Sequence, residues 1–78
     1  MAIRKNTDLR LKRIGLNIRA QREALQLTQE WLAEKADLHD RTVGKIERGE
    51  LNFSVLICLR LCKALNISSE KLLAGARD

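Results

Sequence analysis

The stretch from Thr28 to Glu50, TQEWLAEKADLHDRTVGKIERGE, constrains the fold of this chain more than any other part of it. It contains two short amphipathic segments, which are separated by Asp37 and Leu38, where the apolar pattern is interrupted. Asp is among the few residues that tolerate left-handed backbone geometry, so a sharp turn is expected at Asp37. We therefore predict two short helices that a three-residue turn holds at a fixed angle.

The two predicted helices have recognisable ends. Thr28 is the expected N-cap of the first, because its hydroxyl can accept a hydrogen bond from a free backbone N–H group. The second runs from about His39 to Arg48, and Gly49 ends it as glycine commonly does. The sides expected to be buried carry Leu32, Ala33, Ala36, Val43 and Ile46, and the outer side of the second helix carries Asp40, Arg41, Gly44, Lys45 and Arg48.

A longer helix is predicted before this pair. It begins with Thr7 or Asp8 as its cap and ends near Gln26, which occupies a position where a left-handed glycine would be usual. Apolar residues recur along it at intervals of three, four and seven, which places them on one face. The face expected in the core carries Leu11, Ile14, Ile18 and Leu25.

Two more helices are predicted after the pair. One is capped by Ser54 and continues to about Leu65, where Asn66 ends it. The other is short and begins at Ser68 or Ser69. The whole chain is therefore expected to contain five helices.

Composition favours an all-α fold with one domain. The chain has 78 residues, 45% of them hydrophobic, with no proline and two aromatic residues, which suits a compact helical protein. Residues 1–7 carry Arg4 and Lys5 without helical periodicity, and we expect a flexible basic arm there. Residues 8–78 are expected to form a compact five-helix bundle with almost no β structure.

The charge of the chain indicates an anionic partner. Fifteen Lys and Arg against ten Asp and Glu give a formal net charge of +5, which suits DNA, RNA or an acidic membrane face. No apolar run approaches the roughly 20 residues of a membrane span, and the N-terminal residues lack the apolar core of a signal peptide. We therefore expect a cytoplasmic protein with no membrane partner.

Cys58 and Cys62 are the two cysteines of the chain, four positions apart in one predicted helix. This spacing disfavours a disulfide between them, and with the single His39 they make no metal-ligand set. Two small buried residues are expected, with a thiol switch as the alternative. The chain also lacks a nucleophile paired with a base and a phosphate-binding loop, so we expect no enzyme activity, metal, cofactor or small-molecule ligand.

The segment TQEWLAEKADLHDRTVGKIERGELNFSV resembles the helix-turn-helix of the phage-repressor (Cro/cI-type) family of bacterial transcriptional regulators. The resemblance extends from about Ile14 to Leu73. The chain departs from the family's pattern at two positions, where Asp37 replaces the usual glycine of the turn and Phe53 replaces the usual proline before the fourth helix. It implies a lambda-repressor-like bundle with the helix-turn-helix at about 28–48. Its most specific motifs are T-Q-x-x-L-A (Thr28, Gln29, Leu32, Ala33), Val43 with Ile46, I-E-R-G (Ile46 to Gly49) and L-x-L-x-K-A-L (Leu59 to Leu65).

The resemblance implies that the second helix of the motif enters the major groove of DNA and contacts base edges. Arg41 and Lys45 can donate to a guanine, and Asp40 can accept from a cytosine amino group. Asp40 has two other interpretations, as a cap of the helix or as a residue that orients Arg41. The resemblance implies base contacts at Asp40, Arg41, Gly44 and Lys45. From its chemistry, Thr42 could contact a thymine methyl group or a phosphate, and we include it among the expected base contacts.

The resemblance also implies contacts to the DNA backbone and one internal ion pair. Gln29 corresponds to the family residue that binds a phosphate at the N-terminus of a helix. Arg22 and Glu47 correspond to an ion pair that joins the first helix to the third, and two independent surface charges are the alternative. The implied phosphate contacts are Thr28, Gln29, His39, Arg48 and Asn52.

A homodimer is expected, because one short helix discriminates poorly between sequences and such proteins bind as two-fold dimers. The run VLICL at the start of the predicted fourth helix is apolar on more than one side, so a second surface must cover it. We expect the interface to contain Leu51, Phe53, Leu56 and Ile57. Packing of these residues under the fifth helix is the alternative.

The expected function is sequence-specific regulation of transcription at a palindromic operator. Restriction-modification controller proteins and small phage-type repressors both resemble this chain, and we prefer the controller. The other alternative is an antitoxin-like protein-interaction module that also binds its own promoter. RNA polymerase is a further possible partner, because Glu30 and Glu34 give the second helix an acidic surface.

Overall fold

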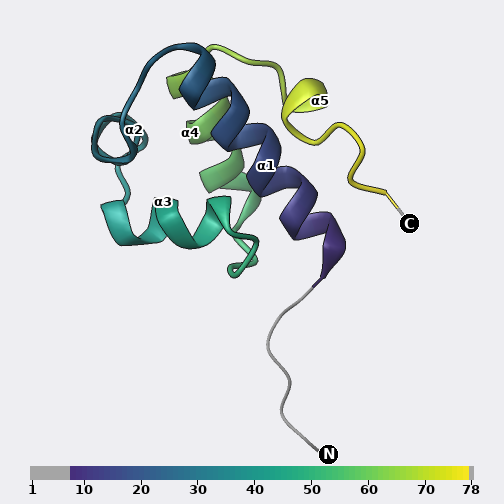
Figure 1. The fold of residues 1–78 in the computed structure, drawn as a ribbon. Coiled ribbons are helices and arrows are strands. Elements are labelled where there is room, and N and C mark those ends of the chain that lie inside the picture. Colours follow the sequence, from purple (N-terminus) through teal and green to yellow (C-terminus); the bar gives the residue numbers. More distant parts are fainter. Residues whose placement is uncertain (1–7, 78) are drawn as a thin grey trace, which may run out of the picture.

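The computed structural model describes residues 8–77, and within them it contains five α-helices and no β-strand (Figure 1). The all-α fold is therefore confirmed. The basic arm expected at residues 1–7 lies outside the described residues. The helices are α1 (Leu9–Ala24), α2 (Gln29–Ala36), α3 (Asp40–Glu47), α4 (Val55–Leu65) and α5 (Ser69–Leu72).

Local side-chain chemistry explains where four of the helices begin. The side chain of Asp8 accepts a hydrogen bond from the backbone N–H of Arg10 at 2.9 Å, which caps α1. The hydroxyls of Thr28, Ser54 and Ser68 accept equivalent bonds at the starts of α2, α4 and α5. Every one of these caps was among the residues expected to fill that role.

Left-handed residues end three helices without glycine. Gln26 has a φ of 59°, Asp37 has a φ of 57° and Asn66 has a φ of 52°. Each conformation is strained for a residue with a Cβ atom, by about 1 kcal/mol. The predicted sharp turn at Asp37 is confirmed, and it leads directly from α2 into the short connection to α3.

The core forms where α1 to α5 converge. Seven of its side chains are fully buried, which shows that all five helices contribute to one hydrophobic cluster. The prediction for Leu25 was wrong, because α1 ends at Ala24 and the side chain of Leu25 is 44% exposed. Leu27, beyond the left-handed turn, packs against the core instead. The fully buried residues are Ile18, Leu32, Val43, Ile46, Leu61, Leu65 and Leu72.

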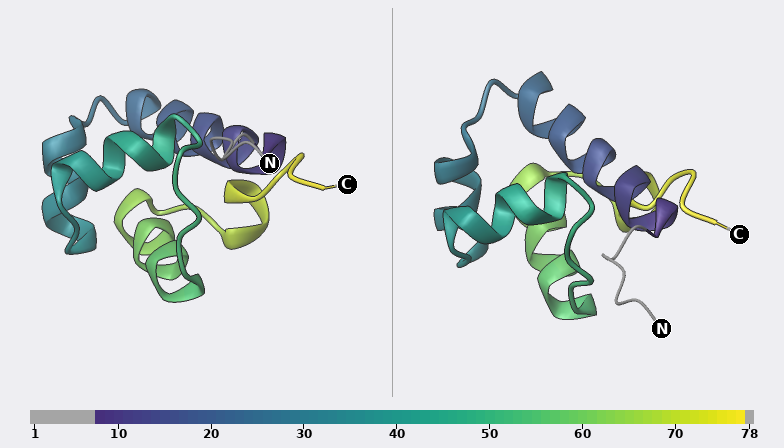
Figure 2. Two further views of the ribbon diagram at one scale, coloured as in Figure 1. Left: turned by 90° about the horizontal axis from the view of Figure 1, so that it is seen from below. Right: turned by 60° about the horizontal axis from the view of Figure 1, so that its bottom comes forward.

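The helix-turn-helix lies at one edge of the bundle. α3 packs against α1 and α2 on its inner side, while α2 also packs against α4 (Figures 1 and 2). α5 packs against α1 and α4, at a distance from the motif in the chain and in the figures. This arrangement leaves the outer side of α3 uncovered, as Figure 2 shows from below.

α1 and α3 approach each other closely at Gly15. A Cβ atom at Gly15 would collide with the backbone carbonyl oxygens of Ile46 and Glu47. A glycine inside a helix costs stability relative to alanine, so its presence here is explained by this approach. The close contact at Gly15 was not predicted, although a glycine inside a periodic helix is a signal for close packing.

None of the helices within residues 8–77 is long and apolar enough to cross a membrane.

Candidate nucleic-acid interface

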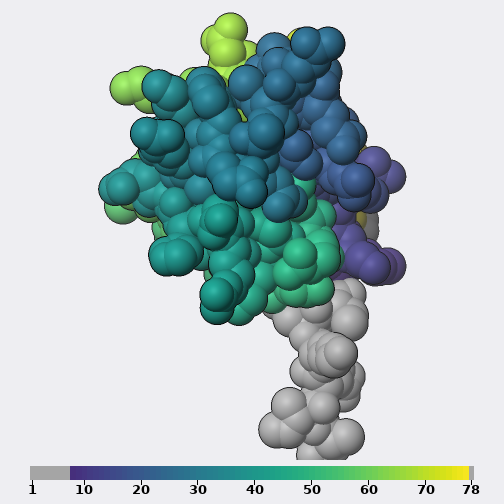
Figure 3. Space-filling model, turned by 60° about the vertical axis from the view of Figure 1, so that its left-hand side comes forward, coloured from purple at the N-terminus to yellow at the C-terminus, as the bar shows by residue number. Residues whose placement is uncertain are grey.

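The outer side of α3 presents charged side chains to solvent. Asp40, Arg41 and Lys45 are exposed and Thr42 is half-buried, whereas Val43 on the opposite side is fully buried. Because the inner side is held in the core, the outer side has a fixed orientation relative to the rest of the domain. α2 and α3 together form a continuous convex surface in Figure 3. The major groove of B-DNA is wide enough to admit a single α-helix such as α3.

Gly44 does not belong to this exposed set, which corrects the expectation that it projects outward. The residue is buried, and the ends of the Arg48 and Gln29 side chains lie over it. Helical periodicity gives the direction of position 44 but does not show that the side chains of Arg48 and Gln29 cover it. Gly44 is therefore covered by residues of the motif itself.

His39 and Asp40 are both exposed at the start of α3. His39 occupies the N-cap position without a side-chain cap hydrogen bond. Its Nδ1 lies 3.6 Å from Oδ1 of Asp40, so the carboxylate is next to the imidazole. The side chain of Asp40 is not the cap of α3, which removes one of its expected alternatives.

The residues after α3 are also exposed. Arg48 donates from Nε to Oε2 of Glu50 at 3.0 Å and from Nη2 to Oε1 at 3.2 Å. These bonds raise the pKa of the Arg48 guanidinium, so its charge is fixed. Asn52 is exposed in the loop that leads to α4. Arg48 and Asn52 thus occupy the end of the motif opposite to His39.

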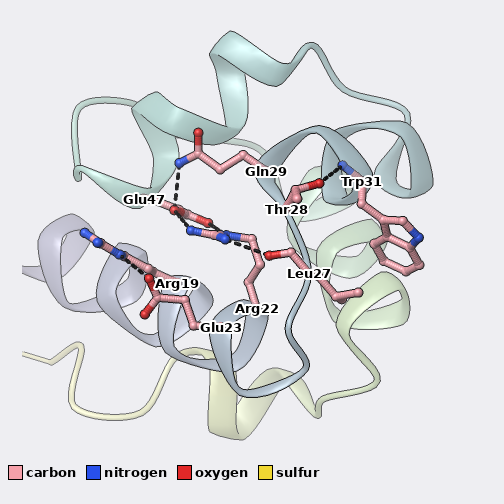
Figure 4. A network of polar contacts seen from close by, with 8 residues as sticks. All are labelled: Arg19, Arg22, Glu23, Leu27, Thr28, Gln29, Trp31 and Glu47. Atoms are coloured by element: carbon pink, nitrogen blue, oxygen red, sulfur yellow. Dashed lines mark hydrogen bonds and ion pairs between the residues drawn. The ribbon is translucent and has the colours of Figure 1, made fainter.

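The N-terminus of α2 lies beside α3. Thr28 is exposed and its hydroxyl accepts from the backbone N–H of Trp31 at 2.9 Å. Gln29 is half-buried and its Nε2 donates to Oε1 of Glu47 at 2.9 Å. The amide of Gln29, the residue expected to contact phosphate, is therefore held by a residue of α3 (Figure 4).

Arg22 and Glu47 join α1 to α3 in a buried network (Figure 4). Arg22 Nε lies 2.7 Å from Oε2 of Glu47, and Nη2 lies 3.1 Å from Oε1. Nη1 of Arg22 also donates to the carbonyl oxygen of Leu27 at 2.8 Å. The hydrogen bonds to Glu47 raise the pKa of Arg22, against the opposing effect of burial. The structure therefore contains the expected ion pair and not two independent surface charges.

A separate apolar surface lies at the start of α4. The side chains of Val55, Leu56 and Leu59 are 74%, 72% and 52% exposed. Leu56 therefore does not pack under α5, which was the alternative considered for it. The three other residues expected at an interface, Leu51, Phe53 and Ile57, are half-buried and pack against the core. Val55 and Leu59 were not among the residues predicted at the interface, although both belong to the apolar run VLICL.

The two thiols are buried and free, as predicted. Burial raises the pKa of the Cys62 thiol, and neighbouring Cys58 raises it further. Within residues 8–77, no group of His, Cys, Asp or Glu side chains could hold a metal ion.

The fold and this surface define a DNA-binding regulator built on a helix-turn-helix. A family model described as helix-turn-helix matches residues 18–72, and the chain belongs to this family. Members of the family are DNA-binding regulators and not enzymes. The resemblance to the controller proteins of restriction-modification systems is also confirmed.

Three proteins are similar to this chain over most of its length. Control protein C.SmaI of Serratia marcescens is 44% identical over 57 residues, which are 73% of this chain and 68% of that protein. The restriction-modification controller protein C.AhdI from Aeromonas hydrophila, known from a crystal structure, is 39% identical to this chain, with a TM-score of 0.78. The match covers 80% of this chain and 94% of the C.AhdI chain. The clp gene regulator ClgR from Corynebacterium glutamicum has 25% identity and a TM-score of 0.80, with coverages of 86% and 87%.

Proposed function

We propose that this chain binds a palindromic operator as a homodimer through the major groove, and that it controls a restriction-modification system. The observation that carries the proposal is the outer side of α3, where Arg41 and Lys45 are exposed while the inner side is buried. An arginine or lysine on a groove-facing helix can donate to guanine O6 and N7. The similarity to C.SmaI and C.AhdI supports the choice of a controller over a phage repressor.

The proposed contacts divide into two groups. Asp40, Arg41, Thr42 and Lys45 contact bases, and Gly44 leaves this group because it is buried. The second group orients the protein on the duplex without specifying sequence, since it contacts phosphates. Its members are Thr28, Gln29, His39, Arg48 and Asn52.

Two copies of the chain are required to recognise a palindrome. We assign the contact between them to the exposed apolar side chains of Val55, Leu56 and Leu59, which this chain leaves uncovered. The half-buried Leu51, Phe53 and Ile57 belong to the same proposed interface. A two-fold dimer would place its two α3 helices about one turn of DNA apart, roughly 34 Å. RNA polymerase is a proposed further partner at the exposed Glu30 and Glu34 of α2.

Selection of bound sites from random duplexes at a stated salt concentration tests this function, because affinity for DNA depends steeply on salt. The proposal expects a palindromic sequence to be enriched. Recovery of no preferred sequence, combined with a steep dependence on salt, would reduce the function to non-specific DNA binding and overturn the proposal.

A further inference from the structure

Gly44 lies in the middle of α3 under the ends of two side chains. A Cβ atom built on it would be 3.2 Å from Nη1 of Arg48 and 3.7 Å from Oε1 of Gln29. Arg48 follows the last residue of α3, and Gln29 is the first residue of α2. The space that a side chain at Gly44 would fill is therefore shared by groups from both helices of the motif.

The guanidinium of Arg48 has a defined orientation in this space. Its Nε and Nη2 atoms both donate to the carboxylate of Glu50, which leaves Nη1 directed over Gly44. The side chain of Arg48 is nevertheless 58% exposed, so it remains accessible to a ligand. The carboxylate of Glu50 thus orients the Arg48 guanidinium on one side. On the other side, the absence of a side chain at Gly44 leaves room for Nη1.

Gln29 is oriented as well. One hydrogen of its Nε2 is donated to Oε1 of Glu47, and an amide nitrogen carries two hydrogens, so a second donor remains for a ligand. Glu47 itself is 3% exposed in its side chain and is fixed by Arg22. The contacts from Arg22 to Glu47 and from Glu47 to Gln29 therefore hold the Gln29 amide in place near Arg48.

We propose that Gly44 is a positioning residue for DNA binding, whose missing side chain lets Arg48 lie against α3 beside Gln29, so that both contact the DNA backbone together. The inference rests on the proposed function. A methyl group at Gly44 would lie 3.2 Å from Nη1 of Arg48, which is tighter than ordinary contact, so the end of the Arg48 side chain would have to shift by a few tenths of an ångström. Because the displaced group is the flexible end of a side chain, the helix itself would remain intact.

The test compares Gly44→Ala, Arg48→Ala and the double variant in titrations of the selected operator duplex over a series of salt concentrations. Gly44→Ala should fold with a thermal midpoint at or above that of the wild type, because alanine favours a helix more than glycine does. Its affinity for DNA should fall, and the slope of log affinity against log salt should become shallower, by up to about 1.8 when the dimer loses one phosphate contact in each subunit, at about 0.9 for each contact. The double variant should bind no more weakly than Arg48→Ala alone.

Lys71→Ala is the charge-matched control, because Lys71 is exposed on α5, which packs against α1 and α4. It should leave the salt slope closer to that of the wild type than Arg48→Ala does. Three results would overturn the proposal: an unchanged slope in Gly44→Ala, losses of affinity that add in the double variant, or failure of Gly44→Ala to fold. A changed base preference would also overturn it, because Gly44 would then lie against a base edge.

Failure of the proposed function is a separate outcome. If the wild type shows no sequence preference, the claim of a specific operator is wrong. The salt slopes of the same variants on a duplex of arbitrary sequence still decide the role of Gly44, because phosphate contacts are independent of sequence.

Discussion

Nε of Arg22 lies 2.7 Å from Oε2 of Glu47, which joins the C-terminal half of α1 to the last residue of α3. The other carboxylate oxygen of Glu47 accepts from both Arg22 and Gln29. One buried carboxylate therefore connects α1, α2 and α3.

Replacing one partner of this pair should destabilise the domain strongly. Glu47→Gln leaves the guanidinium of Arg22 partly buried without a counter-charge, and such a change costs about 3–5 kcal/mol. The free energy of unfolding, measured by denaturant titration, should fall by this order. Arg19→Ala, which breaks an exposed pair with Glu23, is the control and should cost no more than about 1 kcal/mol. Equal losses in the two variants would show that the buried pair has no special role.

Gly15→Ala and Gly44→Ala should have opposite effects on stability, although both replace a helical glycine. At Gly15 the added methyl group meets backbone carbonyls of α3 and should destabilise the domain by about 1–3 kcal/mol. At Gly44 it meets the end of a flexible side chain, and a gain of up to about 1 kcal/mol is expected from helix propensity. Thermal unfolding followed by circular dichroism gives both values. A stabilised Gly15→Ala would contradict the packing of α1 on α3.

Exposed residues on α4 should control assembly. Leu56→Glu combined with Leu59→Glu should give a folded monomer with weak affinity for the operator, because both side chains are exposed and form the proposed dimer surface. Ile57 is a poorer choice for this test, since it packs against the core. Leu9→Glu is the matched control, as Leu9 is 76% exposed on α1. Sedimentation that finds the double variant still dimeric would place the interface elsewhere.

The cap of α1 should make stability depend on pH at the acidic end. The pKa of Asp8 is lowered from 3.8 to about 2, first by the hydrogen bond that its side chain accepts from the Arg10 side chain. Because the pKa of Asp8 is lower in the folded than in the unfolded state, the Asp8 carboxylate stabilises the fold above about pH 4. This stabilisation is lost as the pH falls toward about 2. Asp8→Asn keeps an acceptor for the cap but does not titrate. The thermal midpoint of the wild type should therefore approach that of Asp8→Asn over this range, and parallel curves would refute the assignment.

Features that depend on neighbouring residues were predictable from the sequence. The caps at Thr28 and Ser54 and the turn at Asp37 follow from the chemistry of a few consecutive residues, and the structure contains all three. The buried pair of Val43 and Ile46 was likewise expected, because helical periodicity is strong on α3.

Features that depend on how the helices approach each other were not predictable in the same way. Leu25 fits the apolar period of α1, but the helix ends one residue earlier and the side chain remains exposed. A glycine inside a helix signals close packing, but the groups that lie against Gly15 and Gly44 come from other parts of the fold and were visible only in the structure. The bond between Gln29 and Glu47 crosses from α2 to α3 and has no local signal.

If α3 recognises sequence through its outer side chains, Arg41→Ala should change the base preference of the protein. The affinities of the wild type and this variant are measured, at one stated salt concentration, for the selected operator and for its single-base variants. If Arg41 contacts a base, the variant should lose about 1–3 kcal/mol of discrimination at one position in each half-site and keep its preference elsewhere. An equal loss of affinity for all sequences, with every base preference intact, would contradict the claim.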